Sequence, residues 1–317
     1  MNQSAIHRML AGDPPDGRES LAQGFRMRLA ANMTLLQEAF LELYPGREKD
    51  FERFCRLLGK QFGNRPDALK RQDVERLRVG NWYQSQQWVG MQLYVDRFAG
   101  DLKSLEAKIP YFESLGINYL HLMPLTRQRR GENDGGYAVN SYTEVDRRLG
   151  SQEDLERLTQ AFREKGILLM LDFVVNHTAD SFPWATKAQA GDPFYQAFYY
   201  TYPDRSIPDQ FEASLPEIFP ESSPGNFSWI PEMEKWVMTV FNSYQWDLNY
   251  RNPEVFLAMF ENLTDLAGLG VDVVRFDALA FLWKKLGSDS QNLPGAHTLI
   301  SLFRLGLQVV APGVILL

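Results

Sequence analysis

The sequence predicts an α/β fold, and its repeating pattern of elements favours a (β/α)8 TIM barrel of which about the first five strands are present. A helical pattern, a glycine and a run of apolar residues recur along the chain, as expected for parallel strands covered by helices on both faces. No Gly-rich phosphate loop follows the first strand, which disfavours a nucleotide-binding sheet. A glycine suits the left-handed position just past a helix end. The apolar runs begin at Gly116, Gly166, Gly270 and Gly313.

The chain before the first strand is expected to be helical. Residues 1 to about 20 are polar and are predicted to be frayed. Residues 25–80 carry apolar side chains at helical spacing, and Pro45-Gly46 ends the first of these helices. We therefore expect an N-terminal helical domain over residues 1–85.

The barrel is expected to be interrupted once. Its first part covers residues 86–177, in which Ser151 and Asp154 are predicted to cap a helix. The repeating pattern is absent from residues 178–250, a segment rich in proline and aromatic residues. We interpret this segment as an inserted domain B after the third strand. Residues 251–317 resume the barrel and end within the fifth apolar run.

Composition and charge narrow the function classes. The 317-residue chain has a net charge of −7 and no visible basic face, so we expect no nucleic-acid partner. Arg127, Arg129 and Arg130 form a short basic cluster that we interpret as a solvated loop rather than a phosphate site. The single cysteine, Cys55, excludes an intramolecular disulfide and is expected to be a packing residue. With no secretory leader and no apolar run of ~18 residues, we expect a cytoplasmic protein without a membrane partner.

The fourth apolar run ends in an arginine and an acid that alternation places on the same side. Arg275 and Asp277 then lie at the carboxyl end of the strand, where barrel active sites form. A guanidinium beside a carboxylate lowers the carboxylate's pKa and keeps it ionised, as a nucleophile requires. A structural Arg–Asp pair that closes the barrel mouth explains the pattern equally well.

Three further clusters suit a sugar ligand. His177 follows the third strand, where a neutral imidazole could donate a hydrogen bond to a hydroxyl. Asp134 and Tyr137 follow the second strand; the acid could hold two hydroxyls and the ring could stack on a sugar face, although a simple Asp-Gly turn is the alternative. Phe241 and Gln245 close the inserted segment, where an inter-domain core is an equally good explanation of the aromatic residues.

Short motifs add a family resemblance. DFVVNH in the third strand, GVDVVRFD in the fourth and QWDLN near the inserted segment resemble signatures of the α-amylase superfamily, glycoside hydrolase family thirteen. The set YVDRFAGDL, YLHLMPL, NDGGYAV, LPEIFPE, PGNFSW and TVFNSYQWDLNYRNP resembles the amylosucrase group, which includes amylosucrases and sucrose hydrolases. The resemblance covers roughly residues 25–317.

This resemblance implies a retaining enzyme that takes glucose from sucrose, passes it to an α-glucan and releases fructose, with no metal and no cofactor. The family's general acid is a glutamate after the fifth strand, which lies beyond Leu317, so the chain alone is expected to be inactive. The implied roles are the nucleophile for Asp277, its orientation for Arg275, contact with the glucosyl ring for His177, the pocket floor for Asp134, stacking for Tyr137, and lining of the pocket for Phe241 and Gln245.

Three alternatives stay open. A sucrose hydrolase would form the same intermediate and release it to water. A non-catalytic glucan-binding fragment would keep the aromatic residues without needing the glutamate. Another barrel enzyme of the superfamily, such as an α-glucosidase or a sucrose phosphorylase, would act on a different donor or acceptor.

Overall fold

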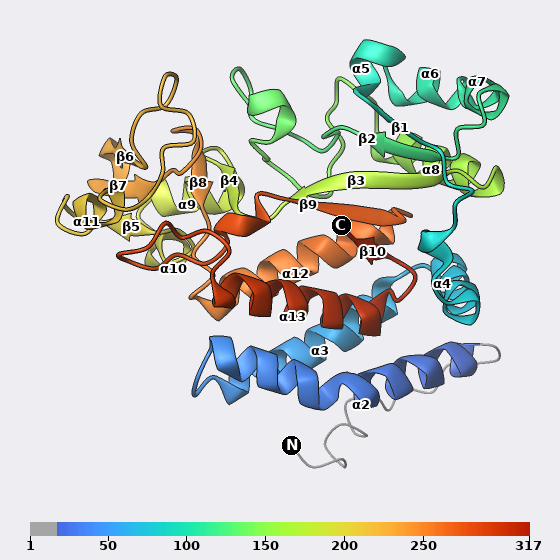
Figure 1. The fold of residues 1–317 in the computed structure, drawn as a ribbon, viewed down its shortest axis with the longest axis horizontal. Helices are drawn as coiled ribbons and strands as arrows, with labels where there is room; N and C mark the ends of the chain where they lie inside the picture. The colour runs from blue at the N-terminus through green and yellow to red at the C-terminus, as the bar shows by residue number, and fades with distance from the viewer. Residues whose placement is uncertain (1–17) are drawn as a thin grey trace.

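Five parallel strands form the central sheet of the computed structural model, which describes residues 18–317 (Figure 1). The strands lie side by side in the order in which they occur along the chain. Because this order never reverses, the sheet winds in one direction, as in a barrel and unlike a doubly wound sheet. The predicted barrel fragment is confirmed. The strands are β1 (Gly90–Leu93), β2 (Tyr119–Leu122), β3 (Leu168–Val174), β9 (Val273–Asp277) and β10 (Ile315–Leu316).

Helices connect these strands, and the predicted helix cap is present. The Ser151 hydroxyl accepts a hydrogen bond from the Asp154 N–H, and the Asp154 carboxylate accepts one from the Ser151 N–H. This reciprocal pair satisfies two backbone donors at the start of α8. The connecting helices are α5 (Val95–Phe98), α6 (Leu102–Glu106), α7 (Ile109–Ser114), α8 (Gln152–Glu164), α12 (Pro253–Gly268) and α13 (Pro294–Val310).

Three of the four repeated glycines have the predicted conformation. Gly116, Gly166 and Gly270 have φ angles of 69°, 67° and 93°, in the left-handed region just past a helix. The prediction is wrong for Gly313, whose φ lies outside that region. A Cβ at Gly313 would lie 2.7 Å from Oδ1 of Asp73, so the close approach of α4 to the start of β10 requires glycine here.

Two N-terminal helices, α2 (Arg18–Leu43) and α3 (Glu48–Asn64), cover the outer side of α12 and α13, and Figure 1 shows them below the two barrel helices. The helix that follows them, α4 (Asp67–Val79), lies to one side. Of the segment expected to be frayed, residues 1–17 lie outside the described residues, and residues 18–20 already belong to α2.

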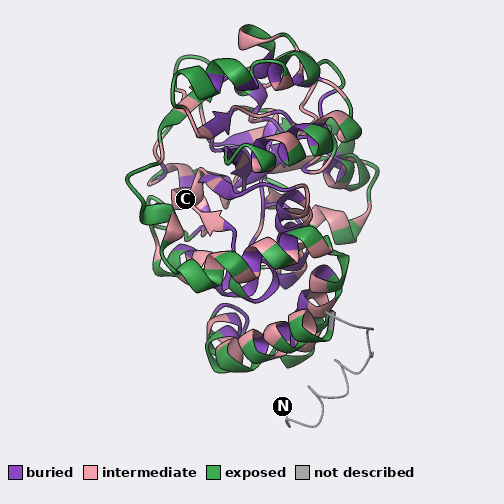
Figure 2. Ribbon diagram, turned by 90° about the vertical axis from the view of Figure 1, so that its right-hand side faces the viewer, coloured by how far each residue is buried: buried purple, intermediate pink, exposed green. Residues whose placement is uncertain are grey.

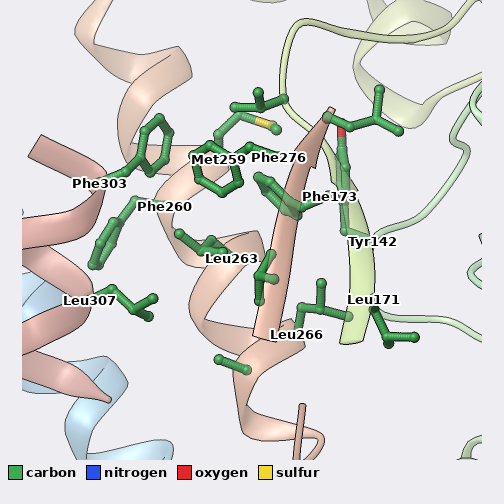
Figure 3. Packing of buried hydrophobic residues seen from close by; sticks show 14 of the residues in the cluster. Tyr142, Leu171, Phe173, Met259, Phe260, Leu263, Leu266, Phe276, Phe303 and Leu307 are labelled. Atoms are coloured by element: carbon green, nitrogen blue, oxygen red, sulfur yellow. The ribbon is translucent and has the colours of Figure 1, made fainter. Parts of the chain in front are cut away.

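A series of aromatic contacts joins the sheet to these helices. Phe276 of β9 lies 5.6 Å from Phe173 of β3 and 5.5 Å from Phe303 of α13, measured between ring centroids (Figure 3). Phe303 in turn contacts Phe256 of α12 at 5.0 Å, and Phe256 contacts Phe54 of α3 at 5.0 Å. Figure 2 shows that the buried residues lie in the sheet and on the inner faces of the helices. One continuous core therefore runs from β3 to the N-terminal helices.

The chain between β3 and α12 forms a separate antiparallel unit beyond the carboxyl ends of the strands (Figure 1). Its first and last strands, β4 (His177–Ala179) and β8 (Gln245–Asp247), pair with each other. Between them lie α9 (Pro183–Gln189), α10 (Pro193–Gln196), α11 (Pro208–Glu212) and the sheet of β5 (Thr201–Tyr202), β7 (Lys235–Met238) and β6 (Phe227–Ile230). The unit has a small core of Tyr200, Phe211, Leu215, Phe227, Met238 and Val240.

Two compositional points have structural counterparts. Cys55 is buried in α3, where burial raises the pKa of its thiol to about 12, so it is the packing residue expected from the sequence. Over residues 18–317, none of the helices combines the length and the apolar character that crossing a bilayer requires.

Candidate active site

An arginine shared by two carboxylates lies at the carboxyl ends of β3 and β9. Arg275 is the register partner of Asp172, and its Nη1 donates to Asp172 Oδ1 at 2.5 Å and to Asp277 Oδ1 at 3.2 Å. The Asp172 side chain is 1% exposed, whereas that of Asp277 is 22% exposed. The buried acid therefore holds the guanidinium, and Asp277 keeps a carboxylate that is open to a ligand.

Asp172 and His121 are site residues that the sequence reasoning missed. Nε2 of His121, on β2, lies 2.9 Å from Asp172 Oδ2, so Asp172 has partners on both neighbouring strands. A signal existed for Asp172, because it stands in the strand-end motif that also contains His177. His121 stands in the quoted motif YLHLMPL, but its contact with Asp172 depends on the register of β2 and β3.

The expected direction of the Asp277 pKa is wrong. Burial disfavours the charged carboxylate and raises the pKa of Asp277, and the nearby His177 and Arg275 offset this only in part. Arg275 lowers this pKa as expected, but the loss of water around the carboxylate outweighs it, and Asp172 takes the shorter bond to the guanidinium.

A second group surrounds the amide of Gln245. Its Nε2 donates to Asp134 Oδ2 at 3.2 Å, and it lies 3.0 Å from His177 Nε2. The Gln245 Oε1 accepts from the backbone N and from Nδ2 of Asn242, at 3.0 and 2.9 Å, which fixes the orientation of the amide. Burial raises the pKa of Asp134, and the bond from Gln245 acts in the opposite direction.

His177 is a buried, neutral imidazole. Its side chain is 1% exposed, and burial lowers its pKa, so the ring is uncharged at neutral pH. Nε2 lies 3.2 Å from the carbonyl oxygen of Tyr137, and the ring centroid lies 5.1 Å from that of Phe241. The carbonyl favours a proton on Nε2 and the amide nitrogen of Gln245 favours a lone pair there, so the tautomer depends on which neighbour is engaged.

Tyr137 lies between the two groups. Its carbonyl faces His177, while its hydroxyl is 3.5 Å from Asp172 Oδ2. The preceding turn is tightly specified: Asp134 has a left-handed φ of 53°, and a Cβ at Gly136 would lie 2.7 Å from Pro124. The structure thus brings the seven residues singled out from the sequence to one side of the strand ends; they are Asp134, Tyr137, His177, Phe241, Gln245, Arg275 and Asp277.

A fully buried ion pair lies next to the strands that carry His177 and Gln245. Lys284 Nζ lies 2.7 Å from Asp247 Oδ1 and 3.1 Å from Asn176 Oδ1, and both charged side chains are 0% exposed. Burial lowers the pKa of Lys284, and the charge of Asp247 opposes this. Asp247 is the register partner of His177 in the β4–β8 pair, so the cluster fixes the strand that carries His177. Within the described residues, no three His, Cys, Asp or Glu side chains are grouped so that they could hold a metal ion.

The fold is a decorated β/α-barrel with acidic residues at the carboxyl ends of its strands. Residues 54–300 match the model of the alpha-amylase catalytic domain, and the chain therefore belongs to the alpha-amylase family. It is 36% identical over 203 residues to a glucosylglycerate phosphorylase of Allomeiothermus silvanus, covering 63% of this chain and 33% of that protein. It is 31% identical over 207 residues to a trehalose synthase of Pimelobacter, covering 65% and 35%. The chain thus spans about a third of the length of these curated relatives.

Solved structures agree on the fold. A structure described as a family GH13_31 enzyme superposes with a TM-score of 0.64 at 26% identity, covering 75% of this chain and 47% of that one. The trehalulose synthase MutB of Pseudomonas mesoacidophila superposes with the same TM-score of 0.64 at 23% identity, covering 72% and 44%. At the latter identity the likeness concerns the fold alone.

Proposed function

We propose that the chain forms the nucleophile-bearing part of a retaining, amylosucrase-like transglucosidase that cleaves sucrose. One observation carries this proposal. Asp277 is a partly open carboxylate at a strand end that accepts a hydrogen bond from Arg275, and it lies near the hydrogen-bonded group of Asp134, His177 and Gln245. Such an arrangement suits attack on a bound sugar, since a nucleophile must keep a lone pair free.

The proposed first step forms a covalent ester. One carboxylate oxygen of Asp277 attacks C1 of the glucosyl unit, and the bond from C1 to the fructosyl oxygen breaks. That oxygen takes a proton from a carboxylic acid, which the family resemblance places after residue 317. In retaining enzymes the two carboxyl groups lie ~5–5.5 Å apart. Arg275 orients Asp277 and favours its ionised form against the effect of burial.

The second step returns the proton. A hydroxyl of an α-glucan attacks C1, the ester to Asp277 breaks, and the hydroxyl proton passes to the carboxylate that served as the acid. The net result is transfer of glucose with retained configuration and release of fructose. Water in place of the glucan hydroxyl gives hydrolysis, which makes a sucrose hydrolase the alternative outcome of the same intermediate.

The remaining site residues are proposed to bind the glucosyl ring. Asp134 accepts a hydrogen bond from Gln245 and can also accept two sugar hydroxyls. The neutral His177 can donate or accept one hydrogen bond at Nε2. Phe241, whose ring centroid lies 5.1 Å from that of His177, and Tyr137, whose hydroxyl lies 3.5 Å from Asp172 Oδ2, are proposed to supply ring faces to the sugar.

The names of the relatives support glucose as the transferred group and suggest one further acceptor. The match to a glucosylglycerate phosphorylase favours phosphate as a second candidate acceptor, in which case the product would be a glucosyl phosphate. Sucrose and an α-glucan remain the proposed partners because the strand and loop motifs resemble the amylosucrase group over most of the chain.

The test uses the full-length protein with sucrose, with and without glycogen or phosphate. Fructose in clear excess over glucose, with extension of the glycogen, is the result expected for the transglucosidase. Equal amounts of fructose and glucose would indicate the hydrolase, and fructose release that requires phosphate would indicate the phosphorylase. No fructose under any condition would overturn the assignment of sucrose. Trehalose and maltose in parallel would then identify the donor.

A further inference from the structure

A pocket of about 460 Å³ lies beside the loop that follows β2, away from Asp277. This volume is within the range of small-molecule sites. Three of its arginines, at 127, 129 and 130, are neighbours in the sequence. The fold adds two more from the other arm of the same loop. The pocket is lined by Arg127, Gln128, Arg129, Arg130, Gly131, Asn133, Asp146, Arg147 and Arg148.

Three of these arginines have carboxylate partners. Arg127 pairs with Glu144 at 2.6 Å, and Arg129 binds Asp180 through Nε at 2.8 Å and Nη2 at 3.2 Å. The Arg148 guanidinium binds both oxygens of Asp146, which is the only acidic residue among those that line the pocket. These three positive charges are therefore compensated.

The other two arginines are not compensated. In the part of the chain that the structure describes, neither Arg130 nor Arg147 forms an ion pair, and both side chains are exposed. Two arginines without a carboxylate partner thus line one pocket, on a chain whose net charge is −7. Two positive charges in one pocket repel each other, and an anion bound between them would offset this repulsion. The charge balance calls for a ligand that carries about two negative charges.

We infer that this pocket binds a phosphate group, as inorganic phosphate or as the phosphate of a sugar phosphate. A phosphate monoester carries ≈ −1.5 to −2 charges at pH 7 and offers three acceptor oxygens. The planar forks of Arg130 and Arg147 match these oxygens in pairs. A single pocket, rather than a basic stripe, fits a small anion and not a nucleic acid.

The pocket shares its wall with the turn that carries Asp134. Asn133 lines the pocket, and its Nδ2 donates to the carbonyls of Gly131 and Arg129 at 2.9 and 3.3 Å. Its Oδ1 accepts from the N–H of Gly136 at 3.1 Å. Asn133 therefore joins the pocket side of the loop to the turn at Asp134. A bound phosphate holds the arginine arm of this loop and so restricts the turn.

The test measures binding to the full-length protein by calorimetry, at constant ionic strength maintained with chloride. Inorganic phosphate, glucose 6-phosphate and glucose are the probes. Saturable binding of either phosphate compound, without binding of glucose at the same affinity, is expected. Tighter binding of glucose 6-phosphate would indicate a sugar phosphate, and equal affinities would indicate free phosphate.

The variant Arg130→Gln/Arg147→Gln removes the two free charges. It is expected to weaken phosphate binding by about tenfold or more for each arginine. The variant Arg56→Gln/Arg78→Gln changes the net charge equally at exposed positions elsewhere and is expected to leave the affinity unchanged. Hydrogen exchange of residues 127–137 is expected to slow when phosphate binds to the wild type. Absence of saturable binding, or equal affinity in the pocket variant and the wild type, would overturn the inference.

Discussion

Two clusters of charged side chains flank His177, and they differ in how completely their acids are satisfied. Asp247 accepts from Lys284 and Asn176 at Oδ1 and from the backbone N–H of Val240 at Oδ2, and it is 0% exposed. Asp277 accepts from one Arg275 nitrogen at 3.2 Å and is 22% exposed. A buried acid with a full set of donors is structural, whereas a partly open acid with few donors retains lone pairs for a ligand. The comparison thus separates a supporting carboxylate from a reactive one within one small region.

The largest expected effect tests Asp277 directly. In the full-length protein, Asp277→Asn is expected to lower kcat by at least about 10⁴-fold, because the amide cannot form the glucosyl ester. Its melting temperature is expected to stay near that of the wild type, since the side chain keeps its shape. The reaction with sucrose is stopped by a rapid quench, and mass spectrometry of the peptide that contains residue 277 then measures the glucosyl adduct. The variant is expected to lack this adduct. Near-normal turnover of this variant would remove Asp277 from the reaction.

The next effect concerns the closed cluster. Lys284→Met leaves Asp247 as an uncompensated buried charge and is expected to cost about 3–5 kcal/mol of unfolding free energy. Denaturant titration of the full-length protein measures this loss. The double variant Lys284→Met/Asp247→Asn is expected to regain part of the lost unfolding free energy, because it no longer contains the buried carboxylate of Asp247. A single variant as stable as the wild type would show that the ion pair has no supporting role.

The pH profile of the reaction tests the arginine between the two carboxylates. Burial raises the pKa of Asp277 and Arg275 opposes this, so Arg275→Gln is expected to raise that pKa further. Activity requires the ionised carboxylate and rises as the pH passes its pKa. The acid limb of kcat/KM is therefore expected to move to higher pH in Arg275→Gln, with Arg275→Lys moving it less. A limb that stays in place or moves to lower pH would contradict the shared-arginine geometry.

A smaller effect links His177 to stability. Its pKa in the folded state lies below the ordinary value of 6.5, so below that pH the unfolded chain binds a proton that the folded chain does not. The contribution of His177 to stability is therefore complete above pH 6.5 and is lost as the pH falls towards the folded pKa. Denaturant titrations from pH 5 to pH 8 are expected to show a shallower acid loss in His177→Gln than in the wild type. Identical slopes would exclude a neutral, buried His177.

The smallest expected effect is the loss of stability on Ser151→Ala, a control substitution remote from both clusters. Ser151→Ala removes one half of the capping box and is expected to cost about 1 kcal/mol of unfolding free energy. The activity and its pH profile are expected to stay unchanged. A change in the pH profile would mean that the acid limb reports general stability and not the ionisation of Asp277.

The sequence predicted what depends on local spacing and on motifs. Alternation placed Arg275 and Asp277 on one side of β9, and the cap at Ser151 followed from residues three apart. The contacts of Asp172 with His121 and Arg275 depend on the register of three strands that are distant in sequence. The ion pair of Lys284 likewise depends on tertiary burial, because nothing in the sequence distinguishes the buried Lys284 from the exposed Lys285 beside it.

The pairing of β4 with β8 has a consequence for how the inserted segment can vary. Ala179 is the partner of Gln245 and His177 is the partner of Asp247, so the candidate site residue Gln245 and the supporting Asp247 alternate with the buried Trp246. A shift by one residue would exchange the two faces of β8 and replace the amide of Gln245 by an indole. Insertions or deletions between these strands preserve the contacts of Gln245 only when they fall before the last turn, at Asn242. Length in the inserted segment is therefore free to change, whereas the phase of its final strand is not.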